Sequence, residues 1–212
     1  MSENIDFIDA IDIHLSQFLG ENDVEELYDD DSEPEPIDLI WIKPNAEVRP
    51  YAILMTCGLS SKAMDMPKGE ENNQFAELVM ILPKNAKAED IESNDEKKRW
   101  PFEHIRQIAR EVLSDESIIS FGTTFTYDED ENFCFPGTNF NSSIILNTKT
   151  LPESFVNIKF NSTIIHLYSV VPLYLQEFIF VEQNDVNLLL DKFNEYKISE
   201  IIDIDRVNTS KL

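Results

Sequence analysis

Apolar residues recur along this chain with two different periods, which predict helices in some segments and strands in others. In residues 4–19 they fall at helical spacing, and Gly20 follows where a helix would end. Residues 101–113 carry an apolar stripe of the same period, behind a proline, Pro101, that suits the first turn of a helix. A last helix is predicted over 186–193 on the same grounds.

Short apolar runs bounded by turn residues lie between these helices, and they predict β-strands. The run at 50–57 is almost continuously apolar, which is typical of a strand buried on both faces. It follows a similar run at 37–43 across a short turn, so the two are expected to pair as a hairpin. Segments 60–74 and 84–99 are expected to be irregular. Further strands are expected at 75–82, 118–127, 143–146 and 163–171, with a short helix opening at Pro172.

Strands interspersed with a few helices predict a single α+β domain over residues 1–212, with helices packed on the faces of a mixed β-sheet. The length of 212 residues and an apolar fraction of 42%, including 14 phenylalanines, are enough for a sizeable core. The side chains expected at the buried centre are Ile53, Met55, Leu78, Met80, Ile108 and Val112.

Residues 21–36 form the most acidic stretch of the chain. Nine acids lie between Glu21 and Glu35 with no basic residue among them, and two prolines stand at the end of the stretch. Mutual repulsion and the prolines predict an exposed acidic loop. Such a loop is either a solvated connection or an arm that contacts a partner, and both interpretations stay open. The residues that would contact a partner are Glu25, Glu26, Asp29, Asp30 and Asp31.

The formal net charge of −24 limits the expected partners. Such a surface repels nucleic-acid phosphates and anionic lipids, so neither nucleic acid nor a membrane is expected as a direct partner. A basic protein would be attracted, more weakly as salt rises, although plain solubility also accounts for the charge. Apolar runs stay well short of the ~20 residues that span a bilayer, and the acidic N-terminus is unlike a signal peptide. A cytoplasmic location is therefore expected.

Residues suited to nucleophilic or metal chemistry are few and scattered. His14, His104 and His166 do not lie at metal-ligand spacing. Cys57 and Cys134 sit among apolar residues, so each is expected to be a small buried side chain. A thiol site would also need a basic neighbour to lower the cysteine pKa, and neither cysteine is flanked by one.

Acidic residues outside the 21–36 segment offer two weaker candidates. Residues 128–132 resemble the start of a calcium loop, but Phe133 stands where glycine is required and Asn139 where glutamate is required. Glu77 and Glu177 would suit paired acid–base work, yet surface or salt-bridge roles are the expected ones. The sequence therefore predicts no catalytic residue, no bound metal and no cofactor.

A set of short motifs in a fixed order is the most informative feature of the sequence. An Arg-Pro pair enters the run at 50–57, a Thr-x-Gly-Leu-Ser segment leaves it, and Met-Asp-Met-Pro follows. The set resembles the Suppressor of fused domain family over nearly the whole chain, with Leu59 in place of the usual methionine. The segment at Gly122 departs from the family because it lacks a Gly-His pair. The resemblance implies structural roles for Arg49, Pro50, Thr56, Gly58, Ser60, Trp100, Pro101, Pro172, Tyr174, Asp205 and Arg206.

This resemblance implies an α/β sandwich that binds another protein and is not an enzyme. Bacterial single-domain members resemble immunity proteins of polymorphic toxin systems, and a net charge of −24 would suit a basic toxin. A regulatory or scaffolding protein with an endogenous partner is the alternative. In so acidic a chain, Arg49 and Arg206 are expected to hold strand ends through Asp or Glu pairs, with direct partner contact as the other interpretation.

Overall fold

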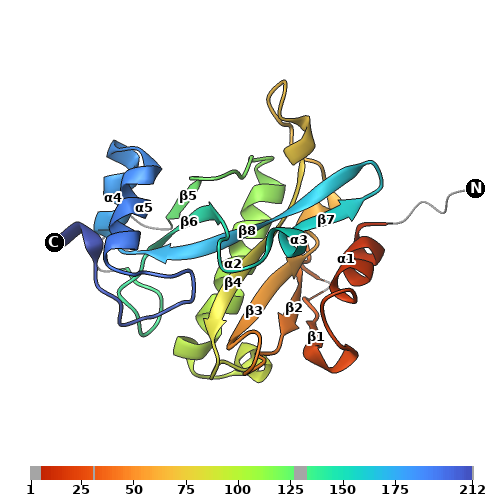
Figure 1. The fold of residues 1–212 in the computed structure, drawn as a ribbon, viewed down its shortest axis with the longest axis horizontal. Helices are drawn as coiled ribbons and strands as arrows, with labels where there is room; N and C mark the ends of the chain where they lie inside the picture. Colours follow the sequence, from red (N-terminus) through yellow and green to blue (C-terminus); the bar gives the residue numbers. More distant parts are fainter. Residues whose placement is uncertain (1–5, 31, 127–132, 212) are drawn as a thin grey trace, which may run out of the picture.

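A computed structural model describes residues 6–30, 32–126 and 133–211 of the chain (Figure 1). The helices are α1 (Phe7–Leu15), α2 (Glu96–Ser114), α3 (Glu153–Val156), α4 (Leu175–Gln183) and α5 (Val186–Glu195). The strands are β1 (Val24–Leu27), β2 (Asp38–Ile42), β3 (Tyr51–Cys57), β4 (Phe75–Pro83), β5 (Thr124–Thr126), β6 (Ser142–Asn147), β7 (Asn157–Phe160) and β8 (Thr163–Leu173).

All of these strands belong to one sheet in the order β1-β2-β3-β4-β8-β6-β5, with β7 paired to β8 outside this path. The pairing of β4 with β8 is parallel, and the other pairings of these strands are antiparallel. The first half of β8 pairs with β7 and β4, and its second half pairs with β6. The sheet is therefore mixed, and the predicted α+β class is confirmed, as is the hairpin of β2 and β3.

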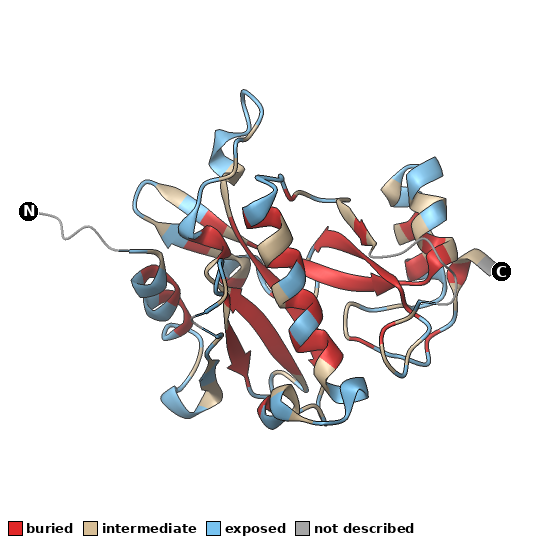
Figure 2. Ribbon diagram, turned by 180° about the vertical axis from the view of Figure 1, so that it is seen from behind, coloured by how far each residue is buried: buried red, intermediate tan, exposed pale blue. Residues whose placement is uncertain are grey.

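Helices cover both faces of the sheet, because alternate side chains of a strand point to opposite faces. Helix α2 lies across one face, over the cluster that includes Leu78, Met80 and Val170 (Figure 2). On the opposite face, α1 and α3 cover the cluster around Val79 and Leu167. Helices α4 and α5 cover that same face farther along β8, over β6 and the C-terminal end of β8. All six side chains expected at the buried centre are at most 2% exposed.

Helix α2 begins earlier than the sequence suggests. Its first residue is Glu96, and the Asp95 side chain caps it by accepting a hydrogen bond from Lys97 N. The expectation that 84–99 is wholly irregular was therefore wrong, and Pro101 lies inside the helix instead of its first turn. A proline there removes a backbone donor, and the hydrogen bond of the Asp95 cap, six residues earlier, helps to offset that loss.

The strand predictions also need correction. Within the described residues, the predicted strand at 118–127 is reduced to β5, and β7 was not predicted at all. Strand β1 lies inside 21–36, so this segment is not a continuous acidic loop. The predicted helix over 4–19 is shorter than expected, because α1 ends at Leu15. No helix in the described part of the chain is both long and apolar enough to cross a membrane.

Candidate functional site

The Thr-x-Gly-Leu-Ser segment, which begins in the last two residues of β3, folds around the carboxylate of Glu77, a fully buried residue of β4. Thr56 Oγ1 donates to Glu77 Oε2 at 2.5 Å. Gly58 N donates to Oε1 at 3.1 Å, and Ser60 donates to the same oxygen from N at 2.9 Å and from Oγ at 2.6 Å. Thr56 Oγ1 in turn accepts from Leu78 N at 2.8 Å. These family-signature residues therefore build a fixed turn around one buried acid.

Glycine is required at the centre of this turn. Gly58 has φ 145°, a conformation that residues with a Cβ rarely adopt. A Cβ there would lie 3.2 Å from Ile37 Cδ1 and 3.3 Å from the carbonyl oxygen of Pro36. Complete burial raises the pKa of Glu77, although the hydrogen bonds from its donors act to lower it. The surface or salt-bridge role expected for Glu77 was therefore wrong, because it is buried among neutral donors.

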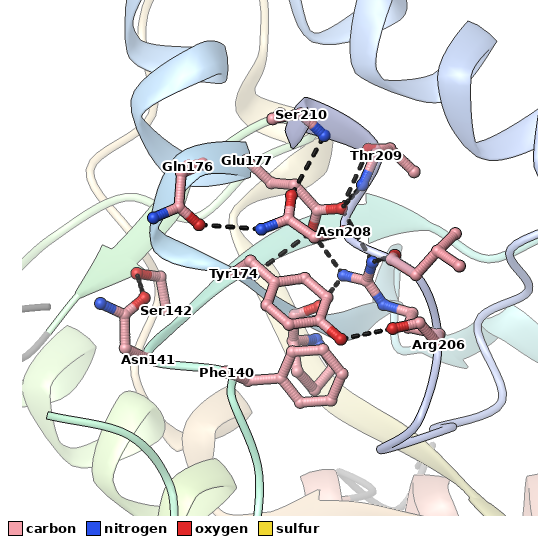
Figure 3. A network of polar contacts seen from close by, with 12 residues as sticks. Phe140, Asn141, Ser142, Tyr174, Gln176, Glu177, Arg206, Asn208, Thr209 and Ser210 are labelled. Carbon is pink, nitrogen blue, oxygen red and sulfur yellow. Dashed lines mark hydrogen bonds and ion pairs between the residues drawn. The ribbon is translucent and has the colours of Figure 1, made fainter. Parts of the chain in front are cut away.

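Glu177, in the first turn of α4, is also fully buried, but it has a cationic partner (Figure 3). Arg206 Nη1 donates to Oε1 at 2.8 Å, and Nη2 donates to Oε2 at 2.5 Å. Thr209 donates to Oε1 from both N and Oγ1 at 2.9 Å. Tyr174 N donates to Oε2 at 3.2 Å. The pair with Arg206 is of the kind that the sequence predicts for this arginine.

Aromatic rings enclose the Arg206 guanidinium. Its carbon lies 4.9 Å from the ring centres of Phe140 and Tyr174 and 5.1 Å from that of Phe193. Arg206 Nη2 also donates to the carbonyl oxygen of Pro172 at 2.9 Å, and the Tyr174 hydroxyl donates to the carbonyl oxygen of Arg206. The C-terminal segment is thereby tied to the end of β8 and to α4 and α5.

The remaining signature residues have different surroundings. Arg49 Nη2 donates to the carbonyl oxygen of Lys43 at 2.7 Å. Its predicted carboxylate partner was wrong, since the ion pairs of the described residues do not include Arg49. Trp100 is buried and stacks on Phe135, with ring centres 5.0 Å apart and planes 4° apart. Asp205 is exposed and stands outside the carboxylate network.

The five acids expected to contact a partner have different environments. Glu25 and Glu26 are exposed on β1, and Asp30 is exposed just beyond it. Asp31 lies outside the described residues. The Asp29 side chain is only 6% exposed, so its predicted place on an exposed acidic loop was wrong.

Asp29 instead joins this segment to α2. Its Oδ2 lies 2.5 Å from Arg110 Nη2 and accepts from Ile37 N at 2.8 Å, and Arg106 Nε is 3.7 Å from Oδ1. Burial acts to raise the pKa of Asp29, but the hydrogen bonds from Ile37 and Arg110 outweigh it and lower the pKa. Arg106 and Arg110 are one helical turn apart, and this spacing is the sequence signal for their shared acid.

The histidines and cysteines do not share a site. Burial lowers the pKa of His104 to about 3, and its Nε2 lies 3.1 Å from Ser143 Oγ. Burial, reinforced by the charge of Glu77, raises the pKa of the Cys57 thiol, which is the reverse of what a nucleophile needs. Within the described ranges, no group of three or more His, Cys, Asp or Glu side chains is placed to hold a metal ion. The acidic residues 128–132 lie outside those ranges.

Fold and site together define an α+β protein with a mixed sheet, in which five of the signature residues bind two buried glutamates. The family model described as Suppressor of fused protein (SUFU) matches residues 33–207. The chain therefore belongs to the SUFU family. Among curated proteins, none matches this chain.

Solved structures share the fold at low sequence identity. A SUFU homolog from Neisseria gonorrhoeae FA 1090 is 14% identical, with a TM-score of 0.66 over 94% of each chain. A chain in the crystal structure of the Sufu–Fu complex is 13% identical and has a TM-score of 0.65, over 95% of this chain and 91% of that chain. Drosophila Suppressor of Fused is 14% identical and has a TM-score of 0.54, over 83% of this chain but 43% of the Drosophila chain.

Proposed function

We propose that this chain is a non-catalytic protein-binding module whose partner is a basic protein. Membership of the SUFU family supports a binding role, as does the fold shared with the structure of the Sufu–Fu complex. The net charge of −24 is the main support for a basic partner, and three acids of α1 and β1 add to it. Asp9, Asp12 and Glu26 are absent from the ion pairs of the described residues.

The roles of the ionisable residues in the interior support a function without catalysis. The carboxylates of Glu77 and Glu177 are occupied by structural donors. His104 is held neutral by burial, and Cys57 is held as a thiol. Groups bound or neutralised in this way stabilise the fold and are poorly placed for proton transfer or attack on a substrate.

The most specific form of the proposal is an immunity protein that covers the active surface of a basic toxin; an endogenous regulatory partner is the alternative. Expressing the product of the directly upstream gene in a bacterial host, with and without this chain, separates the two. Toxicity that this chain relieves, together with a direct complex of the purified proteins, supports immunity. A harmless upstream product, or toxicity that persists in the presence of this chain, overturns it.

The exposed acids Glu25, Glu26 and Asp30 form what we call the acidic face. Its role is tested by measuring the rate at which this chain associates with the product of the upstream gene. Replacing Glu25 and Glu26 by Gln and Asp30 by Asn should lower the association rate toward the unsteered ~10⁵–10⁶ M⁻¹s⁻¹. Exposed charges are screened over about 8 Å at physiological ionic strength, so the parent should lose most of its advantage at high salt. The matched control neutralises the exposed acids Glu89, Asp191 and Glu195. Equal slowing by both variants would leave net charge, and not this face, as the cause.

A further inference from the structure

Strand β1 is an edge strand of the sheet. Half of its backbone N–H and C=O groups point away from its neighbour β2. Lys43 N donates to the carbonyl oxygen of Asp23 at 2.8 Å, which fixes the alternation of the ladder between β1 and β2. In such a ladder, every second residue directs its N–H and C=O away from the neighbouring strand. Val24 and Glu26 occupy these positions, so their backbone groups face outward, where a further strand would pair.

A groove of about 860 Å³ runs beside this edge, between α1 and β1. Val24 packs with the cluster that α1 covers, whereas Leu27 packs with the cluster on the α2 side, so the Glu26 side chain also faces α1. The groove combines an apolar part with three carboxylates. The apolar part consists of Leu15, Leu19 and Val24, and the carboxylates are those of Asp12, Glu21 and Glu26.

The charge of the groove defines what would occupy it. Lysine and arginine are absent from the described residues that line it. Burial and the charges of Glu26 and Asp9 raise the pKa of Asp12. A bound cation would reduce the repulsion between these carboxylates. The neighbouring groove along α2 also has acids, but it differs because Arg106 and Arg110 line it and pair with Asp29.

We propose that the outer edge of β1 takes up an extended segment of a basic partner protein as an additional strand, with Lys or Arg at alternate positions against Asp12 and Glu26. This inference rests on the proposed binding of a basic protein and specifies how it is bound. In strand addition, backbone hydrogen bonds supply affinity and alternate side chains supply specificity. Every second side chain of the added strand would face the groove beneath α1.

Charged residues on an edge strand also serve to keep copies of a protein from pairing. That role explains the acids of β1 equally well, but it requires neither the groove nor the carboxylate of Asp12 on α1. The two interpretations differ in what an alternating basic peptide does, because a purely protective edge has no preference for one.

The test is a titration of the isotope-labelled full chain with a capped octapeptide of alternating Lys and Val, followed by NMR. Amide signals of Val24 and Glu26 should shift and become protected from hydrogen exchange. Neutralising Asp12→Asn or Glu26→Gln should each weaken binding ~2–5-fold at low salt, while the matched surface change Asp191→Asn should not. A block peptide of the same composition, with four Lys followed by four Val, should bind more weakly.

Glu26→Pro removes the outward N–H while leaving the inward ladder intact, and proline is tolerated at such edge positions. Compared with Glu26→Gln, which also lacks the carboxylate, it should weaken binding of the alternating peptide by a further ~3–10-fold, the effect of one lost hydrogen bond. Glu26→Gln keeps the question decidable should the proline variant fail to fold. Binding that ignores peptide alternation, or shifts confined to other strands, overturns strand addition even if the toxin still binds. If the peptide binds at β1 but the product of the upstream gene does not bind this chain, the proposed function is overturned instead.

Discussion

Glu77 and Glu177 are both fully buried, yet the molecule compensates them in opposite ways. Glu177 faces the guanidinium of Arg206, whose charge balances its own. The Glu77 carboxylate is instead surrounded by hydroxyl and amide donors from the end of β3 and the turn that follows. Each glutamate holds one segment of backbone: the turn from Thr56 to Ser60 in one case, and the C-terminal segment in the other.

The two sites should respond differently when one partner is removed. Deleting one member of a buried ion pair leaves an uncompensated charge, which is among the most destabilising changes known in cores. Deleting one of several neutral donors leaves a carboxylate that retains the others, at the smaller cost of an unsatisfied hydrogen-bonding group. The site of Glu177 should therefore be the more sensitive to loss of one partner. The raised pKa of Glu77 should in turn make the stability of the protein depend on pH.

The largest expected effect is that of Arg206→Ala, which leaves the Glu177 carboxylate without its cation. The free energy of unfolding should fall by about 3–5 kcal/mol in urea denaturation. The matched control is Lys62→Ala, because Lys62 pairs with Glu116 and both side chains are exposed. Such an exposed pair is worth ~0.2–1 kcal/mol. If both variants cost the same small amount, the buried pair does not hold the C-terminal segment.

Thr56→Val addresses the other carboxylate and should cost about 1–3 kcal/mol. The change keeps the shape of the side chain but removes the hydroxyl that donates to Glu77 and accepts from Leu78 N. Thr163→Val is the control, because the Thr163 hydroxyl is buried without a partner in the described structure. Urea denaturation of both variants decides the matter. A Thr56→Val variant as stable as its control would mean that the hydroxyl contributes nothing.

Local pattern in the sequence was enough to predict the central strands and α2. The runs that become β3, β4 and β8 are apolar and β-branched, and the stripe over 102–113 has a helical period that packing on the sheet requires. Strand β1 was missed because it has only two apolar residues among acids. It forms by pairing with β2, and that pairing depends on tertiary contacts that a local pattern does not contain.

The candidate site was predicted in its residues but not in its arrangement. The motif indicated Thr56, Gly58 and Ser60, but not that all three donate to Glu77, about twenty residues farther along the chain. One signal was present: an acid inside a strand that is apolar on both faces must find donors in the interior. The run of acids predicted that Asp29 is exposed. Its side chain is instead buried against α2, where it pairs with Arg110.

The smallest change per step of the measurement is expected for the pH dependence that Glu77 confers. Its folded-state pKa is raised, so the folded protein binds this proton more tightly than the unfolded chain. The resulting stability is fully present below the unfolded pKa, near 4.5, and is lost as pH rises through the folded pKa. The advantage of the parent over Glu77→Gln should therefore shrink with rising pH, by at most ~1.4 kcal/mol per pH unit.

His104 acts in the opposite direction, because its folded pKa of about 3 lies below the ordinary 6.5. Its contribution is present above pH 6.5 and is lost on acidification, so the profile of the parent alone combines both groups. The difference between the parent and Glu77→Gln cancels the His104 contribution, since both proteins retain this histidine. Urea unfolding from pH 4 to 8, with the exposed Glu195→Gln correcting for one lost charge, measures that difference. An advantage that grows with pH would mean that the four donors hold Glu77 ionised and that the two buried glutamates differ less than their partners suggest.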